Sequence, residues 1–230
     1  MAKIFKEYFK IMKLIKTLKW VVAFVAVALT SNANAVPVTA LDYSGGSGPG
    51  VAMEITAGGT FQTAGAAALS SFLNWATFLP VADAVGKVRI SGVQLTGAAV
   101  SIFGMISQAT TGGMVEALDA ANNVLLSATF TNGVISLASS GAGSQFSVGL
   151  ATFGGTLASY FIPTSATHSV SLINWSPVGL VMGNDQMSRI GASSGFGNGL
   201  IAGTEVPEPT TMLLLGSGIL GAALKRKKVA

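Results

Sequence analysis

The sequence predicts an all-β fold, an antiparallel β-sandwich of the jelly-roll or immunoglobulin-like kind with one short helix. Three observations support this prediction. From residue 51 to residue 193 the apolar segments are five to ten residues long, glycine-rich turns separate them, and Val, Ile, Thr, Ser and Phe dominate them. Several segments also alternate apolar and polar residues, as strands with one buried face do. Short strands with turns between them favour a sandwich over a helical or parallel α/β domain.

The expected strands follow one another through the middle of the chain. In the segment 87–95, Val88 and Ile90 point to one side, whereas Lys87 and Arg89 point to the other. This is the pattern of a half-buried strand. The full set of expected strands is 51–55, 87–95, 99–106, 114–118, 123–130, 133–139, 144–153, 155–162 and 168–175.

Local turn chemistry is most informative at residues 114–130, which we expect to form a hairpin. Asp119 can cap the turn through its side chain, and Asn122 or Asn123 can adopt the left-handed conformation that a tight turn requires. The segment 63–84 is different, because it is rich in alanine and ends its apolar cluster before a proline. We expect one short helix or an irregular covering loop there.

The N-terminal residues 1–35 have the order of a secretory signal peptide: cations, an apolar run and a small-residue end. Ala33 and Ala35 fit the site of a signal peptidase, which would leave residue 36 as the new N-terminus. The apolar run of ten residues, 20–29, is too short to span about 30 Å of hydrocarbon as a retained anchor. Met12 already opens a complete signal peptide, so either translation starts there or residues 1–11 form a cationic amphipathic stretch.

The remaining chain divides into a glycine-serine linker at 36–50, the β-sandwich at 51–193, a glycine-rich linker at 194–205 and a tail at 206–230. Residues 36–205 hold three cations and seven carboxylates, a net charge of −4, although the whole chain carries +4. The basic residues therefore belong to the ends. An acidic middle without a basic patch excludes nucleic acid as a partner.

The middle of the chain contains no recognisable catalytic constellation, and we expect a protein that is not an enzyme and binds no cofactor or metal. His168 is the single histidine and there is no cysteine. The glycine-rich stretch 191–195 has the G-x-S-x-G form around Ser193, but His168 precedes the serine, contrary to the order in hydrolases of that motif. Trp75 and Trp175 could stack on a sugar, although core packing is the more common role.

The tail combines a Val206-Pro207-Glu208-Pro209 motif, an uncharged run at 212–224 and four terminal cations, Lys225, Arg226, Lys227 and Lys228. The run fits a short transmembrane sorting helix, with the cations retained on the cytoplasmic side as a stop-transfer signal. This combination resembles the PEP-CTERM sorting signal of exported Gram-negative proteins. The resemblance implies that Val206–Pro209 is the recognition motif of an exosortase, a membrane-embedded cysteine protease.

These observations predict an exported protein of the cell surface or extracellular matrix. The expected partners are signal peptidase and exosortase during export, the membrane through the C-terminal helix before processing, and polysaccharide in the matrix. The resemblance also implies a setting of exopolysaccharide and biofilm. The alternative is a secreted carbohydrate-binding or carbohydrate-cleaving module, which an exposed Trp75 or Trp175 beside two carboxylates would favour and two buried rings would oppose.

Overall fold

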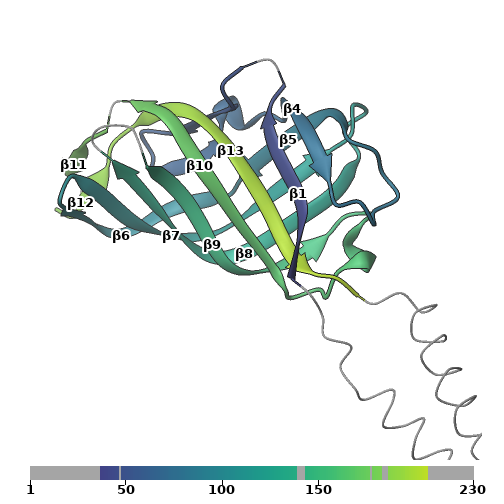
Figure 1. The fold of residues 1–230 in the computed structure, drawn as a ribbon. Coiled ribbons are helices and arrows are strands. Elements are labelled where there is room, and N and C mark those ends of the chain that lie inside the picture. The colour runs from purple at the N-terminus through teal and green to yellow at the C-terminus, as the bar shows by residue number, and fades with distance from the viewer. Residues whose placement is uncertain (1–36, 47, 139–142, 177, 183–185, 207–230) are drawn as a thin grey trace, which may run out of the picture. The chain divides into compact units, whose positions relative to one another are not determined.

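The computed structural model describes residues 37–46, 48–138, 143–176, 178–182 and 186–206, and they form one antiparallel β unit (Figure 1). Within the described ranges, no helix has the length and apolar character needed to cross a membrane. The elements are β1 Pro37–Gly45, β2 Val51–Ile55, β3 Thr60–Thr63, η1 Ala64–Ala66, β4 Leu69–Trp75, β5 Ala84–Ser91, β6 Val93–Ile102, β7 Met105–Leu118, β8 Val124–Ala138, β9 Ser144–Gly154, η2 Ala158–Tyr160, β10 Ala166–Ser176, β11 Leu180–Met182, β12 Ser188–Ile190 and β13 Ser193–Thr204.

The main sheet has 11 strands in the order β1-β4-β5-β7-β6-β3-β2-β13-β10-β9-β8, and further pairings join β1 to β13 and β7 to β8. Hydrogen bonding therefore continues around the unit from β13 through β1, β4, β5 and β7 to β8. This confirms the predicted all-β antiparallel fold, whose two sides face each other across one core as the layers of a sandwich do. The small β11–β12 hairpin forms a separate two-stranded sheet.

Two long strands change partners along their length, and this lets the sheet bend around the core. β7 pairs with β6 from Met105 to Thr110 and with β5 from Met114 to Leu118. The two strands that pair with β7 follow each other in the sequence, and Gly92 lies between them. Its φ of 72° is in the left-handed region that glycine adopts without strain. In the same way β13 pairs first with β2 and then with β1.

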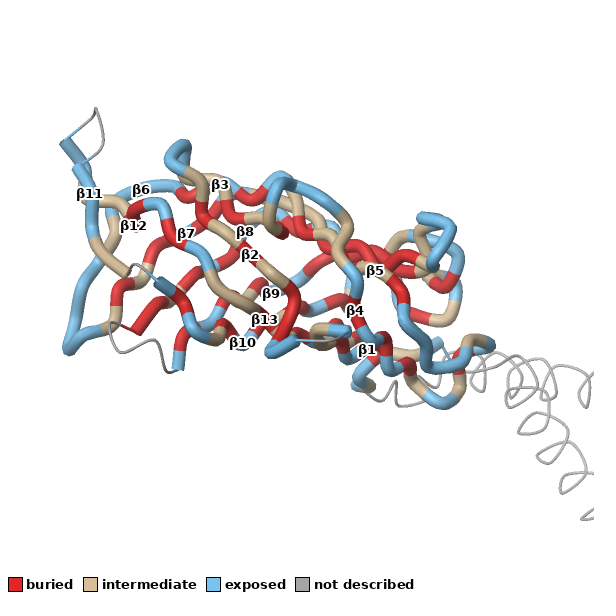
Figure 2. The backbone as a smooth tube through the Cα atoms, turned by 90° about the horizontal axis from the view of Figure 1, so that it is seen from above, coloured by how far each residue is buried: buried red, intermediate tan, exposed pale blue. Residues whose placement is uncertain are grey.

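The core lies between the two sides and is continuous (Figure 2). Its centre is aromatic, because Phe146 lies 4.8 Å from Phe61 and 5.8 Å from Phe130, measured between ring centroids. Trp175 extends this group, 6.0 Å from Phe61. Tilted contacts of this kind are the favoured geometry for aromatic pairs.

The predicted hairpin at 114–130 is present as the turn between β7 and β8. The carboxylate of Asp119 accepts hydrogen bonds from the backbone N–H and the side-chain amide of Asn123, each 2.8 Å long. Asn122 has a φ of 69°, the predicted left-handed conformation. The alternation predicted around Val88 is also confirmed, since Val88 and Ile90 are fully buried.

Both segments that we expected to be linkers contain strands, which corrects the prediction. β1 occupies most of 36–50, and β13 extends through 194–204. The glycines of β13 serve packing rather than flexibility. Tyr43 lies directly over Gly199, and Val170 and Met53 lie so close to Gly197 that an added Cβ would sit 2.6 and 2.7 Å from them. Large side chains from other strands therefore fill the space that small residues on β13 leave.

The expected strand 99–106 is divided by the turn between β6, which ends at Ile102, and β7, which begins at Met105. Two other expectations are also wrong. The segment 63–84 holds a three-residue 3₁₀ turn and the strand β4 rather than an α-helix, because Ser71, Leu73 and Trp75 alternate into the core. The segment 155–162 is a turn that contains η2, not a strand. In both places tertiary burial outweighs the local composition.

Candidate functional site

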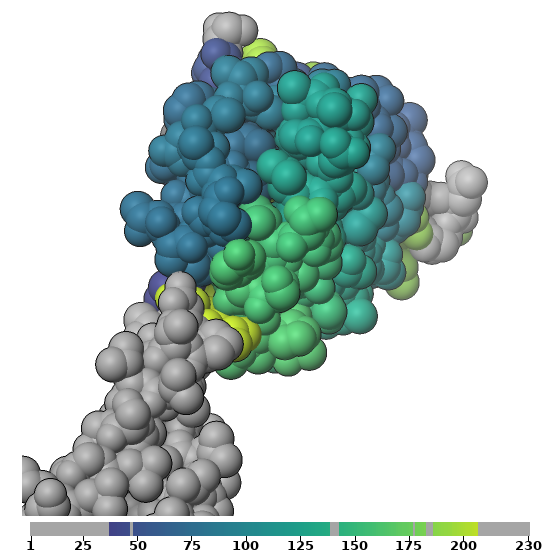
Figure 3. All heavy atoms as spheres, turned by 90° about the vertical axis from the view of Figure 1, so that its right-hand side faces the viewer, coloured from purple at the N-terminus to yellow at the C-terminus, as the bar shows by residue number. Residues whose placement is uncertain are grey.

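The sorting motif begins at the edge of the folded unit. Val206 is the first motif residue, is 40% exposed, and donates a backbone hydrogen bond of 2.8 Å to the carbonyl oxygen of Tyr160. Glu205 pairs with Phe161 in an isolated antiparallel bridge. Figure 3 shows this yellow end of the chain against the green segment that follows β9. The other predicted processing residues lie outside the described residues: Ala33, Ala35, Pro207, Glu208, Pro209, Lys225, Arg226, Lys227 and Lys228.

The serine of the G-x-S-x-G stretch is held in the core. Ser193 is 6% exposed, and its Oγ accepts a hydrogen bond of 2.8 Å from the indole Nε1 of Trp175. His168 pairs across β10 and β13 with Ile201, eight positions along β13 from Ser193. At about 3.3 Å per residue this separates the two residues by roughly 26 Å. The structure therefore does not bring Ser193 and His168 together.

His168 forms a buried pair with Tyr43 that the sequence did not predict. The Tyr43 hydroxyl and His168 Nε2 lie 2.8 Å apart, and the two rings stack with centroids 5.9 Å apart. Desolvation by burial lowers the pKa of His168 to about 3 and raises the pKa of Tyr43 above its usual range. Both groups are therefore neutral at pH 7, and the pair links β1 to β10 over β13, the strand that lies between them.

Both tryptophans of the folded unit are buried. Trp75 is 6% exposed and Trp175 is 3% exposed. Asp83 accepts a hydrogen bond of 2.7 Å from the backbone N–H of Trp75, so this carboxylate fixes the chain after β4. The burial of both rings is the condition that opposes a carbohydrate-binding cleft built on these residues.

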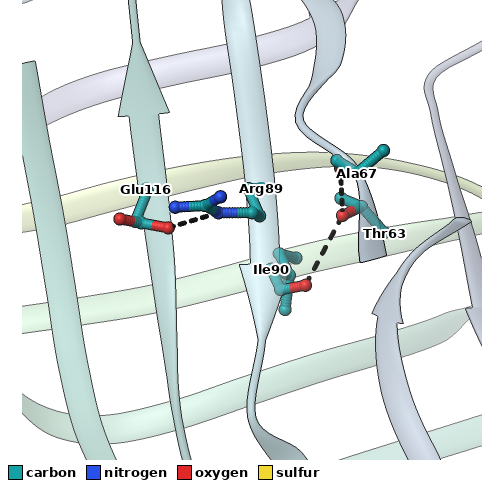
Figure 4. Close-up of polar contacts among 5 residues, drawn as sticks. All are labelled: Thr63, Ala67, Arg89, Ile90 and Glu116. Atoms are coloured by element: carbon teal, nitrogen blue, oxygen red, sulfur yellow. Dashed lines mark hydrogen bonds and ion pairs between the residues drawn. The ribbon is translucent and has the colours of Figure 1, made fainter. Parts of the chain in front are cut away.

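Two carboxylates of the described strands, Glu54 and Glu116, have structural partners. Arg89 Nε donates to Glu116 Oε2 over 2.6 Å between β5 and β7, and this hydrogen bond raises the pKa of Arg89 (Figure 4). Nearby, the Thr63 hydroxyl donates to the Ala67 carbonyl oxygen over 2.6 Å and closes the turn after β3. Among the described residues, no group of three His, Cys, Asp or Glu side chains is placed to hold a metal ion.

Four neighbouring strands, β8, β9, β10 and β13, contain no Asp, Glu, Lys or Arg. We call their outward surface the charge-free face. Hydroxyl and amide side chains cover much of it, because most apolar residues of these strands point inward; Val134, Leu150 and Leu200 are exposed. The low charge of the middle of the chain is visible in the sequence, but the adjacency of these strands depends on pairings between distant segments.

One row of paired residues crosses this face and continues onto the neighbouring strand β7. Paired positions place Ser107, Ser136, Gln145, Ser171 and Asn198 side by side on β7, β8, β9, β10 and β13. The Ser107 and Ser136 hydroxyls are hydrogen-bonded over 2.9 Å. We call these five residues the polar row. At about 4.8 Å between strands it is roughly 19 Å long.

A protein-family model described as the PEP-CTERM protein-sorting motif matches residues 205–227. The matched range includes Val206–Pro209 and the first three terminal cations. No curated protein and no solved structure matches the chain. Proteins with this motif are exosortase substrates and are sorted at the membrane. The chain therefore carries a PEP-CTERM protein-sorting motif at residues 205–227, which indicates an exported protein that is sorted through this segment.

Proposed function

We propose that the folded unit is a non-enzymatic protein of the cell surface or extracellular matrix that associates with neutral polysaccharide through the charge-free face. The observation that carries this proposal is the absence of Asp, Glu, Lys and Arg from β8, β9, β10 and β13. A surface of this kind offers hydroxyl and amide groups that both donate and accept hydrogen bonds. Exopolysaccharide and biofilm are the setting in which such a surface acts.

The polar row matches the chemistry of a neutral glycan chain. Ser and Gln side chains can exchange hydrogen bonds with sugar hydroxyls without desolvating a charge, whereas the Asn198 amide already donates to the Pro49 carbonyl oxygen over 3.3 Å. A second row beside it pairs Val134 with Ser147, Ser147 with Ser169, and Ser169 with Leu200. Val134 and Leu200 are 44% and 38% exposed and provide apolar contacts for the C–H faces of sugar rings. The face therefore offers both kinds of contact that a hexose makes.

The net charge of −4 on residues 36–205 favours a neutral polymer over an anionic one. A chain of uronic acids would be repelled at long range and would find no cation on the charge-free face. A neutral polymer meets no such barrier, and its binding is insensitive to salt because no ion pair forms. Many weak contacts along a polymer then add through multivalency.

The separation of His168 from Ser193 and the burial of both side chains support the proposal that the folded unit is not an enzyme. Buried groups of this kind have no access to a polymeric substrate. Assays of the exported protein against ester and glycoside substrates test this part. Turnover that disappears in a Ser193→Ala variant, assayed under conditions in which the variant is folded, would contradict it.

Binding is tested with exported protein recovered from the native host and with two polymers, a neutral β-glucan and a polyuronate. The Gln145→Glu variant puts an isosteric negative charge in the middle of the polar row. Gln94→Glu is the matched control, because Gln94 is exposed on β6, away from the charge-free face. We expect co-sedimentation with the glucan to fall for Gln145→Glu and to stay at the wild-type level for Gln94→Glu. Salt-sensitive binding to the polyuronate, unaffected by Gln145→Glu, would overturn the proposal.

The final location is tested separately by fractionating the native host with and without its exosortase. We expect the protein at the surface or in the matrix of the normal host, and in the membrane fraction when exosortase is missing. Recovery from the same fraction of both hosts would contradict sorting to the surface by this enzyme.

A further inference from the structure

The sorting motif and the folded unit overlap by two residues. The family match begins at residue 205, whereas the described fold continues through Val206. β13 ends at Thr204, and Glu205 and Val206 continue the strand by pairing with the segment that contains Tyr160 and Phe161. The motif therefore starts inside the fold, with no spacer between the last strand and the residues to be recognised.

The end of β13 is held from both sides. On one side, Thr204 pairs with Pro37 at the start of β1. On the other side, the Ile162 N–H donates to the Thr204 carbonyl oxygen and the Val206 N–H donates to the Tyr160 carbonyl oxygen, each over 2.8 Å. These bonds hold Glu205 opposite Phe161 in the middle of the pairing.

The segment opposite Glu205 is itself anchored in the core. Phe161 is 1% exposed and stacks on Phe153 with ring centroids 4.5 Å apart. Phe78 contacts Phe161 edge-on at 5.8 Å. The Ser165 hydroxyl also stabilises the contact between β13 and this segment. Its Oγ accepts a hydrogen bond from the Thr204 N–H and donates one to the Ile162 carbonyl oxygen, each over 2.8 Å. The end of β13 is thus docked on a fixed surface.

The contact with the Tyr160–Ile162 segment uses a backbone N–H of the motif, and the motif contains few such groups. Pro207 and Pro209 have no N–H, so Val206 and Glu208 supply the two backbone donors between residues 206 and 209. Val206 already donates to Tyr160. Enzymes and domains that bind an extended peptide commonly do so through its main-chain hydrogen bonds, as an added strand. A sorting enzyme that bound the motif in this way would therefore compete with the fold for the same N–H group.

We propose that the docked end of β13 is a gate on sorting: exosortase engages the motif only in molecules whose Glu205 and Val206 have separated from the Tyr160–Ile162 segment. Strand ends open locally at far lower free energy than the whole domain unfolds. When opening is fast compared with engagement, the rate of processing follows the population of the open form. The stability of a few hydrogen bonds thus sets how quickly the folded protein is sorted.

The first test inserts Gly-Ser-Gly-Ser between Thr204 and Glu205 in the full-length chain, expressed in a host with exosortase. The inserted backbone can occupy the docking positions, so the motif is released while its own sequence is unchanged. The control places the same four residues after Gly48, in a loop where a Cβ at Gly48 meets no atom within 4 Å. We expect pulse-chase removal of the tail to be several-fold faster for the first insertion and unchanged for the control. An unchanged or slower rate for the first insertion overturns the gate.

The second test weakens docking without lengthening the chain. Ser165→Ala removes the hydrogen bond from the Thr204 N–H at the end of β13 and the one to the Ile162 carbonyl oxygen beside it, and we expect tail removal to be roughly two- to ten-fold faster. Ser101→Ala, at an exposed position of β6, is the matched control. Ile135→Val, at a fully buried position, lowers global stability without touching the gate. If Ile135→Val accelerates processing as much as Ser165→Ala does, global unfolding controls access and the local gate is wrong.

A third measurement does not depend on exosortase. In protein from a host without the enzyme, we expect the Val206 amide to exchange its hydrogen slowly and to exchange faster in Ser165→Ala. Exchange of the Val206 amide at the rate of an unstructured peptide would refute docking itself. The gate rests on sorting by exosortase and not on polysaccharide binding, so either proposal can fail while the other stands.

Discussion

Residue His168 makes the stability of the folded unit depend on pH below neutrality. It is the one histidine of the chain, and burial beside Tyr43 lowers its pKa from 6.5 to about 3. In the unfolded chain the imidazole takes up a proton near pH 6.5, whereas in the folded protein it stays neutral until much lower pH. Unfolding is therefore coupled to proton uptake between these two values. The stabilisation is fully present above the unfolded pKa and is lost as the pH falls toward the folded pKa.

The size of the effect follows from linkage. Between about pH 7.5 and about pH 5, the single imidazole should remove about 2 kcal/mol from the free energy of unfolding. Tyr43, the titratable group in contact with the ring, stays protonated throughout, because burial raises its pKa further. Hydrogen bonds from Asn123 lower the pKa of Asp119, so this carboxylate titrates below the chosen window.

Urea unfolding of the purified exported protein at the two pH values measures this change directly. His168→Gln is the informative variant, because its amide keeps a hydrogen-bonding group beside Tyr43 but does not titrate. We expect the variant to be less stable at neutral pH and nearly independent of pH across the window. An equal loss of stability in the variant and the wild type would show that other groups carry the pH dependence and would refute the reasoning.

Three further substitutions test packing and turn geometry by chemical denaturation. Asn122→Val places a β-branched residue at a φ of 69° and should cost roughly 1–2 kcal/mol; unchanged stability would contradict the left-handed turn. Gly203→Ala adds a Cβ against the ring of Phe153 and should cost about 1–3 kcal/mol through overpacking, whereas a gain would show an unfilled space. Ser193→Ala leaves the buried indole N–H of Trp175 without its acceptor and should cost about 1–3 kcal/mol. A stable Ser193→Ala variant would mean that this hydrogen bond is not formed.

Local chemistry explains which parts of the fold the sequence predicts. The turn between β7 and β8 is specified by residues within it, since Asp119 binds Asn123 four positions away and Asn122 tolerates a positive φ. Strand alternation around Val88 is equally local. Such features require no knowledge of what lies across the core, and the structure confirms them.

The missed strands depend on partners far away in the sequence. β13 looks like a flexible linker because it is rich in glycine, yet Gly199 is small because Tyr43 lies over it, and Gly203 is small because Phe153 does. No pattern within residues 194–204 reveals those partners. The same holds for the pair of Tyr43 and His168, which are 125 positions apart. The sequence alone therefore does not distinguish a flexible linker from a strand whose glycines make room for large side chains on another strand.

The positions of the two ends connect the fold to the predicted processing of the chain. A signal peptidase cut after Ala35 leaves one residue before β1, and the family match to the sorting motif begins at the residue directly after β13. Pro37 and Thr204, the first residue of β1 and the last of β13, pair with each other. The pair that joins β1 to β13 at this end of the sheet is thus formed by the strand residues that lie nearest to the two processing signals. Trimming that removed Pro37 or Thr204 would open the sheet at this edge, whereas processing outside them leaves every strand intact. Both export signals can therefore be removed without loss of the fold, provided that the cut at the C-terminal end falls after the last residue of β13.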